Sequence, residues 1–254
     1  MKSKYLPLAL SLSLMAASLQ SIYAQAKVTV NLPAKVIYTD SDTKLTDFTY
    51  TKQGYLKSYK SYFEKNGYDT MTYSYKGAHI VKETSTYHPG PDDGYDKDAH
   101  KPKIKKYSYN KKGQISQIGK LKLTYNKDNT VNKTIGKNVV NTRLYNRKKQ
   151  VVTTKITSKE DGISITYTSH QSYDKHGNII AVKPTNPGFE TTHYKYTYNK
   201  NGDITKVSNT KISYQQMTIP KASLKMVKDQ QKAFLISRIL KIENGEPIVY
   251  FTGE

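Results

Sequence analysis

The feature that most constrains the fold of this chain is a seven-residue pattern that recurs along it. The pattern reads Tyr, Asn or Asp, Lys or Arg, a free position, usually Gly, another free position, then Ile or Val. Self-similarity of this kind indicates that each copy forms the same structural unit. The five clear copies are Tyr109–Ile115, Tyr125–Val131, Tyr145–Val151, Tyr173–Ile179 and Tyr198–Ile204, with a looser first copy at Tyr50–Leu56.

Each copy predicts a β-hairpin with a three-residue loop. The Asn or Asp favours a type I turn because its side chain can bond its own backbone. The fourth residue after the Tyr must then adopt φ > 0, which Gly does without steric cost. We assign Gly113, Gly177 and Gly202 to this position, with Asn129 as the next best choice. Lys149 fits the position poorly, which leaves a different turn open in that copy.

The loop also predicts which residues face each other across each hairpin. The first Tyr of a copy pairs with its last Ile or Val on one face of the sheet. One step back from the last turn, Tyr196 is expected to face Lys206. Tyrosines alternate with period two along the strands, as at Tyr194, Tyr196 and Tyr198, so we expect their rings to pack on the sheet and their hydroxyls to face water. The predicted pairs are Tyr109 with Ile115, Tyr125 with Val131, Tyr145 with Val151, Tyr173 with Ile179, and Tyr198 with Ile204.

Consecutive hairpins of this kind predict an all-β protein, built as an antiparallel meander in an extended or spiralling sheet. The repeat sheet is assigned to residues 25–215, and a C-terminal segment, 216–254, is expected to pack on it. Residues 221–235 are open between a short helix and two strands, because Lys, Ala, Leu, Met and Gln favour helix. Residues 236–251 predict a hairpin closed by Asn-Gly, and residues 27–47 predict a strand pair that turns at 40–42.

The first residues have the pattern of a signal peptide. Lys2 and Lys4 give a basic start, Leu6–Leu19 is an apolar run, and Ala24-Gln25-Ala26 offers small residues at cleavage spacing. We therefore assign residues 1–24 to a cleavable signal and expect an extracytoplasmic protein, periplasmic or secreted. The alternative is an uncleaved anchor, which the short and Ser-interrupted apolar run disfavours.

Composition narrows the partners of the chain rather than its fold. Its 254 residues carry a formal charge of +21 and contain no cysteine, which excludes disulfides, thiolate zinc sites and a lipid on an N-terminal cysteine. Such a charge favours an anionic polysaccharide, a cell-surface polymer, nucleic acid or an acidic protein partner. The alternative is that the lysines only keep exposed strand edges from pairing with other chains.

No motif predicts an enzyme, a cofactor or a metal centre. The six histidines are scattered without metal-ligand spacing, and the chain has no nucleophile elbow, phosphate-binding loop or dinucleotide fingerprint. The acidic loop Asp92–His100 is the one local cluster of possible cation ligands. It departs from the twelve-residue calcium loop, so a solvated loop is the favoured interpretation.

The repeated Tyr and Gly positions resemble those of the YD-repeat, or RHS, family of exported bacterial proteins. The resemblance covers roughly residues 48–214, although the literal Tyr-Asp pair occurs in one copy, at Tyr173-Asp174. It implies consecutive β-hairpins from a long, spiralling sheet, which in the large members closes into a shell around a toxin. It implies no catalytic residues. The structural positions that carry it are Tyr109, Gly113, Tyr125, Tyr145, Tyr173, Gly177, Tyr198 and Gly202.

These observations predict an exported, non-enzymatic module that binds an anionic polymer or a protein partner. Lysine recurs in nearly every turn, so consecutive hairpins should place a line of cations along one edge of the sheet. Two other functions stay open: an extracytoplasmic hydrolase with carboxylates on long loops, and a small RHS-like shell or toxin-associated protein. The candidate residues for an anionic ligand are Lys111, Lys127, Lys175, Lys200, Tyr194 and Tyr196.

Overall fold

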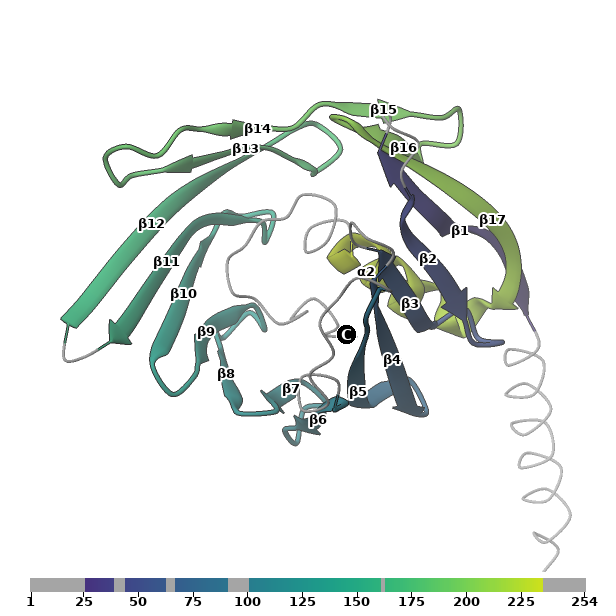
Figure 1. The fold of residues 1–254 in the computed structure, drawn as a ribbon, viewed down its shortest axis with the longest axis horizontal. Helices are drawn as coiled ribbons and strands as arrows, with labels where there is room; N and C mark the ends of the chain where they lie inside the picture. Colours follow the sequence, from purple (N-terminus) through teal and green to yellow (C-terminus); the bar gives the residue numbers. More distant parts are fainter. Residues whose placement is uncertain (1–25, 39–43, 63–66, 91–100, 161–162, 235–254) are drawn as a thin grey trace, which may run out of the picture.

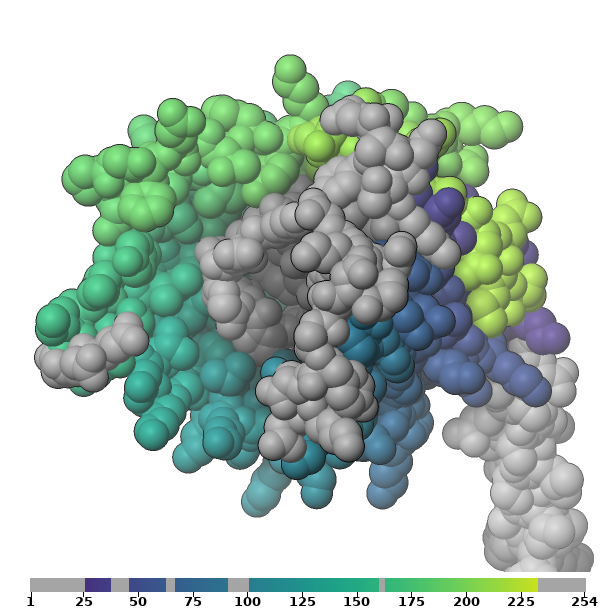
Figure 2. Space-filling view, viewed as in Figure 1, coloured from purple at the N-terminus to yellow at the C-terminus, as the bar shows by residue number. Residues whose placement is uncertain are grey.

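The computed structural model describes residues 26–38, 44–62, 67–90, 101–160 and 163–234. Almost all of them lie in β-strands that follow one another around the middle of the view in Figure 1. The colours of Figure 2 pass in the same order around the molecule, so sequence order is also spatial order.

Seventeen strands precede the single α-helix of the described chain. The strands are β1 (Lys27–Tyr38), β2 (Lys44–Tyr50), β3 (Leu56–Tyr62), β4 (Tyr68–Lys76), β5 (His79–His88), β6 (Lys103–Tyr109), β7 (Ile115–Ile118), β8 (Leu121–Tyr125), β9 (Val131–Ile135), β10 (Val139–Tyr145), β11 (Val151–Glu160), β12 (Ile163–Tyr173), β13 (Ile179–Pro184), β14 (Thr192–His193), β15 (Tyr196–Tyr198), β16 (Ile204–Val207) and β17 (Thr210–Pro220). A 3₁₀ turn, η2 (Lys221–Ser223), leads into helix α2 (Leu224–Phe234).

The strands form one antiparallel meander. Each strand pairs with the next one along the chain from β1 to β14 and again from β15 to β17. The first and last strands also pair, over most of the length of β1. No ladder joins β14 to β15 within the described chain, and these two strands are successive parts of one extended segment. The sheet therefore curls through almost a full turn without closing.

The five repeats form the predicted hairpins with the predicted partners. The register pairs Tyr109 with Ile115, and the other four Tyr positions pair with their Ile or Val in the same way. Gly113, Gly177 and Gly202 adopt φ of 75°, 82° and 82°, and Asn129 adopts 70°. The fold class and the turn chemistry expected from the sequence are confirmed.

Two details of the repeats differ from expectation. Lys149 adopts φ 57°, so the third copy forms the same turn as the others despite its unfavourable residue. Tyr196 faces Val207 rather than Lys206, which instead faces Thr197. The reason is a β-bulge directly beyond the turn, between Thr197 and Tyr198, which shifts the register by one residue.

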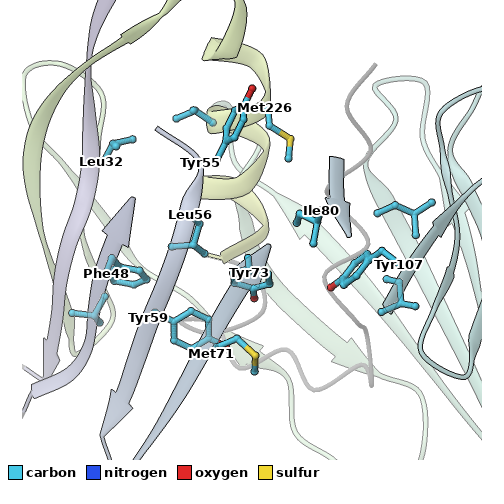
Figure 3. Packing of buried hydrophobic residues seen from close by; sticks show 14 of the residues in the cluster. Leu32, Phe48, Tyr55, Leu56, Tyr59, Met71, Tyr73, Ile80, Tyr107 and Met226 are labelled. Carbon is cyan, nitrogen blue, oxygen red and sulfur yellow. The ribbon is translucent and has the colours of Figure 1, made fainter. Parts of the chain in front are cut away.

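The apolar side of the curled sheet packs against helix α2 near β1–β4 (Figure 3). Met226 and Val227 of the helix are buried with strand residues such as Leu32, Leu56 and Tyr59. The buried positions of this segment, Ser223, Met226, Val227 and Gln230, recur at helical spacing and therefore form a single face.

Polar bonds fix α2 in place. The Gln230 side chain accepts a hydrogen bond from the backbone N–H of Leu56 at 2.8 Å and donates one to the Tyr75 hydroxyl at 3.1 Å. Gln231 donates to the carbonyl of Asn31 at 2.8 Å. These contacts tie the helix to three strands of the sheet.

The ambiguity of residues 221–235 is thus settled in favour of a short helix up to Phe234. The signal segment 1–24, the turn at 40–42, the acidic loop 92–100 and the hairpin at 236–251 lie outside the described residues, and the domain boundaries stay predictions. No helix of the described chain combines the length and apolarity needed to cross a membrane.

Candidate functional site: the turn rim

The five repeat turns share one hydrogen-bond pattern, which explains their sequence. In the first, Asn110 donates its backbone N–H to the Gln114 carbonyl at 2.8 Å, and Gly113 donates to the Asn110 carbonyl at 3.0 Å. The Asn110 side-chain oxygen accepts the backbone N–H groups of Lys112 and Gln114, at 2.9 and 3.0 Å. The same side-chain bonds recur at Asn146, Asp174 and Asn199. An Asn or Asp is therefore needed to satisfy the backbone of the turn.

These turns lie at the same end of their strands, and hydrogen bonds join the first copy to the second, the second to the third, and the fourth to the fifth. Gln114 donates to the Asn129 side chain at 3.2 Å, and the Lys149 ammonium donates to the Asp128 carbonyl at 3.0 Å. Farther along, the Tyr198 hydroxyl donates to Asp174 at 2.8 Å. Figure 1 shows the β8–β9, β10–β11 and β12–β13 turns side by side. We call this edge the turn rim and define it as residues 110–113, 126–129, 146–149, 174–177 and 199–202.

The predicted lysines are exposed along this rim. Within the described chain, the ammonium groups of Lys111, Lys127, Lys175 and Lys200 have no hydrogen bond or ion pair. Each repeat contributes two strands, and strands are about 4.8 Å apart, which puts neighbouring turns about 10 Å apart. The four predicted lysines therefore lie at successive points along the turn rim, and the third turn adds Arg147 and Lys148 between Lys127 and Lys175.

The two tyrosines that were grouped with these lysines lie elsewhere. Tyr194 and Tyr196 are half-buried and pack against the apolar core. The Tyr196 hydroxyl donates to the Ile179 carbonyl at 2.6 Å. Neither ring belongs to the turn rim, so a ligand on the rim would be held by cations and not by stacking on these tyrosines.

Seven tyrosine hydroxyls donate to backbone carbonyls of the preceding hairpin. The sequence predicted that these hydroxyls would face water, and that prediction is wrong for these seven. Tyr125 donates to the Ile115 carbonyl at 2.6 Å, and Tyr145 donates to the Val131 carbonyl at 2.8 Å. Ile115 and Val131 are the last residues of the two preceding motif copies. We call this series the tyrosine ladder; its members are Tyr75, Tyr109, Tyr125, Tyr145, Tyr173, Tyr196 and Tyr214.

The tyrosine ladder fills a gap in the strand pairing between successive hairpins. Pairing between β7 and β8 begins at Gln117, so the carbonyl of Ile115 has no partner in that strand ladder. The same two-residue offset follows Val131, Val151, Ile179 and Ile204. A buried carbonyl without a partner costs free energy, and the phenol of the next repeat supplies its donor. The repeated Tyr therefore links each hairpin to the next.

Burial of these phenols changes their acidity. Burial raises the pKa of Tyr109 to about 12 and that of Tyr125 to about 12, and it raises the pKa of Tyr214 still further. Although burial opposes it, hydrogen bonds from the Asn178 backbone, the Tyr198 hydroxyl and other donors hold the pKa of Asp174 below its usual range. At neutral pH Tyr109, Tyr125 and Tyr214 are therefore protonated and Asp174 is ionised.

The described chain contains a buried carboxylate. Its buried carboxylate, Glu83, is 5% exposed and bonds both the Lys105 ammonium and the Tyr107 hydroxyl at 3.0 Å. These two partners give Glu83 a structural role. Across the described ranges, no three His, Asp or Glu side chains converge as metal ligands.

Sequence comparisons agree with this architecture. A model of the teneurin YD-shell family matches residues 98–235, which is more than half of the chain. No curated protein sequence shows a significant match.

Two solved structures resemble the chain distantly. One is a porin-like protein from Bacteroides uniformis, at 15% identity and a TM-score of 0.34, covering 75% of this chain and 95% of that one. The other is the Tc holotoxin pore of Photorhabdus luminescens, at 10% identity and a TM-score of 0.30. That match covers 77% of this chain but 13% of the toxin chain. The repeat turns, the curled meander and the family match together show that the chain belongs to the teneurin YD-shell family of YD-repeat, RHS-like proteins.

Proposed function

We propose that this protein is an extracytoplasmic binding module whose turn rim binds a linear anionic polymer. The observation that carries the proposal is the contact between successive turns, which aligns exposed lysines that have no partner in the described chain. A row of cations at regular spacing matches the regular charges of an acidic polysaccharide better than it matches a compact ligand. The hydrogen-bonded turns fix the backbone from which each lysine extends before the ligand arrives, which lowers the ordering cost of binding.

The strength of this binding would come from several lysines acting together. Fields between exposed charges fade over about 8 Å at physiological ionic strength, so each lysine acts mainly on the nearest charge of the polymer. Release of counterions from the polymer supplies most of the free energy, and affinity therefore falls steeply with salt. A single Lys→Ala change should be mild.

A comparison of two variants with equal charge tests the proposal. The rim variant replaces Lys111, Lys127, Lys175 and Lys200 with Gln. The control variant replaces four exposed lysines at or near the opposite ends of the strands with Gln: Lys103, Lys120, Lys137 and Lys159. We expect the rim variant to bind heparin at least tenfold more weakly than the control at about 50 mM salt, where such binding is strong. Equal affinity of the two variants would show that net charge alone attracts the polymer.

Export is a separate part of the proposal. The basic start, apolar run and small-residue site of residues 1–26 support cleavage before Gln25 or Lys27. The mature chain then keeps a charge of about +19, because the signal contains two lysines and no acid. Intact-mass measurement on protein from the extracytoplasmic fraction tests this part, and a mass that retains residues 1–24 would contradict it.

A second candidate function uses the apolar side of the curled sheet to hold a protein or peptide, as a small shell or toxin-associated protein would. Side chains on this side along β12 are exposed: Ile163 is 65% exposed, Ile165 is 43% exposed, and Tyr167 is 43% exposed. The three positions alternate along one strand and therefore share one face. Their apolar character favours a protein contact over a polyanion at that part of the molecule.

A further inference from the structure

A cleft of about 240 Å³ lies where helix α2 meets the fourth and fifth turns of the rim. One wall carries the apolar side chains of Ile204, Ile212 and Tyr214. The Tyr214 ring is held there because its hydroxyl donates to the Ile204 carbonyl at 2.7 Å. The volume is on the scale of a single sugar ring, and an aromatic wall is a suitable surface for the C–H face of a sugar.

The residues that helix α2 contributes to the cleft include two lysines. Lys228 and Lys232 of α2 are exposed, and neither has a hydrogen bond or ion pair within the described ranges. They are four residues apart on the helix, so both ammonium groups lie on the same face. Like charges at this spacing repel each other, and an anion bound between them would remove that repulsion.

The polar groups at the rim side of the cleft complete the lining. His176 belongs to the fourth turn, Asn178 directly follows that turn, and Asp203 directly follows the fifth. Asp203 accepts hydrogen bonds at its Oδ2 atom from Asn31 at 2.7 Å and from Asn199 at 2.9 Å, which fix the position of this carboxylate. Because Asp203 repels an anion, the two cations of α2 mark the part of the cleft that would hold the acidic group of a ligand.

We propose that this cleft binds one anionic sugar unit, with its acidic group between Lys228 and Lys232 and its ring against Tyr214. The inference rests on the proposed function in one respect: the unit would belong to the acidic polymer that follows the rim. A carboxylate and a phosphate offer the same chemistry to two ammonium groups, and the choice between them is a matter for experiment. The cleft would add recognition of one sugar unit to the less specific attraction of the rim.

Ligand-observed NMR titration of the mature protein tests the cleft with three small probes: glucuronate, glucose 6-phosphate and neutral glucose. The cleft variant replaces Lys228 and Lys232 with Gln. A matched control replaces Lys211 and Lys221, two exposed lysines that do not line the cleft. We expect wild type and control to bind at least one anionic probe with equal affinity, the cleft variant to bind it at least tenfold more weakly, and glucose to bind no protein.

The outcomes separate the cleft from the rim. Tighter binding of glucuronate assigns the cleft to a uronate, and tighter binding of glucose 6-phosphate assigns it to a phosphorylated sugar; both support an anionic sugar. Absence of binding by either anionic probe, or equal binding by the cleft variant, would overturn the inference. The rim variant should keep its affinity for the small probe while it loses heparin. A rim variant that keeps heparin binding would therefore contradict the proposed function of the turn rim but not the proposed sugar site in the cleft.

Discussion

Removal of one hydroxyl from the tyrosine ladder should destabilise the protein measurably. Tyr125→Phe keeps the ring but deletes the donor that lies 2.6 Å from the Ile115 carbonyl. Ile115 is fully buried, and pairing between β7 and β8 begins two residues later, so the neighbouring strand offers no replacement donor. A buried group left without its partner costs about 1–3 kcal/mol. The Tyr125 ring is half-buried and water can approach it, so we expect the lower half of this range, about 1–2 kcal/mol.

Thermal unfolding of the variant beside a matched control measures this cost. For a chain of this size, each kcal/mol lowers Tm by about 2–4 °C, so Tyr125→Phe should lower Tm by about 2–8 °C. Tyr167→Phe is the control because Tyr167 is 43% exposed and outside the ladder. A surface change of that kind should stay within about 0.5 kcal/mol of wild type. If the two variants unfold at the same temperature, the ladder bonds do not stabilise the repeats and the reasoning fails.

Three further predictions concern the tyrosine ladder, the turns and the acidic loop 92–100. The stability that the buried phenols contribute should be fully present below about pH 10, the pKa of tyrosine in the unfolded chain. It should fall as the pH rises towards 12, because the pKa values of Tyr109 and Tyr125 in the folded chain are raised to about 12. Circular dichroism as a function of pH checks this prediction. Gly202→Val should destabilise the chain by about 1–2 kcal/mol because of the φ of 82° alone, since a Cβ there meets no atom within 4 Å. Lys149→Gly should instead stabilise the chain by up to about 1 kcal/mol, because Lys149 holds a φ of 57°. If denaturant unfolding shows no change in either variant, the turn assignment is contradicted. EDTA should leave Tm unchanged, and a clear decrease would instead indicate a calcium site in the loop 92–100.

The repeat motif predicted the fold because its local chemistry determines both the turn and the register. The Asn or Asp that bonds its own turn and the residue at φ > 0 fix which Tyr faces which Ile. The same local logic misjudged Lys149. The bonds between Asn146 and Gln150, together with contact to the preceding turn, hold that lysine in a conformation that a free lysine rarely adopts.

The tyrosine ladder was beyond the sequence argument because it depends on contacts between repeats. Pairing with the following strand begins two residues after the last residue of each copy, and this offset became clear only from the pairing of the strands. A signal was nevertheless present, since a Tyr recurs at the end of each entering strand where Phe would pack as well. The hydroxyl bond explains why the seven positions of the tyrosine ladder carry Tyr rather than Phe.

The candidate site was predicted in part. The row of turn lysines followed from the repeat, and the structure aligns those turns through direct contacts. The cleft could not be predicted, because Lys228 and Lys232 are distant in sequence from the turns and reach them only through the packing of α2 on the sheet. Residues 221–235 were ambiguous between helix and strand, and a strand would have separated these two lysines.

The salt dependence of heparin affinity tests the central claim most directly. Each phosphate or sulfate contact made by a rim lysine should contribute about 0.7–0.9 to the slope of log affinity against log salt, by analogy with nucleic acids. Removal of the four rim lysines should therefore reduce the magnitude of the slope by about 3, whereas removal of Lys103, Lys120, Lys137 and Lys159 should leave it nearly unchanged. Equal slopes for the two variants would contradict the claim that the turn rim binds the polymer.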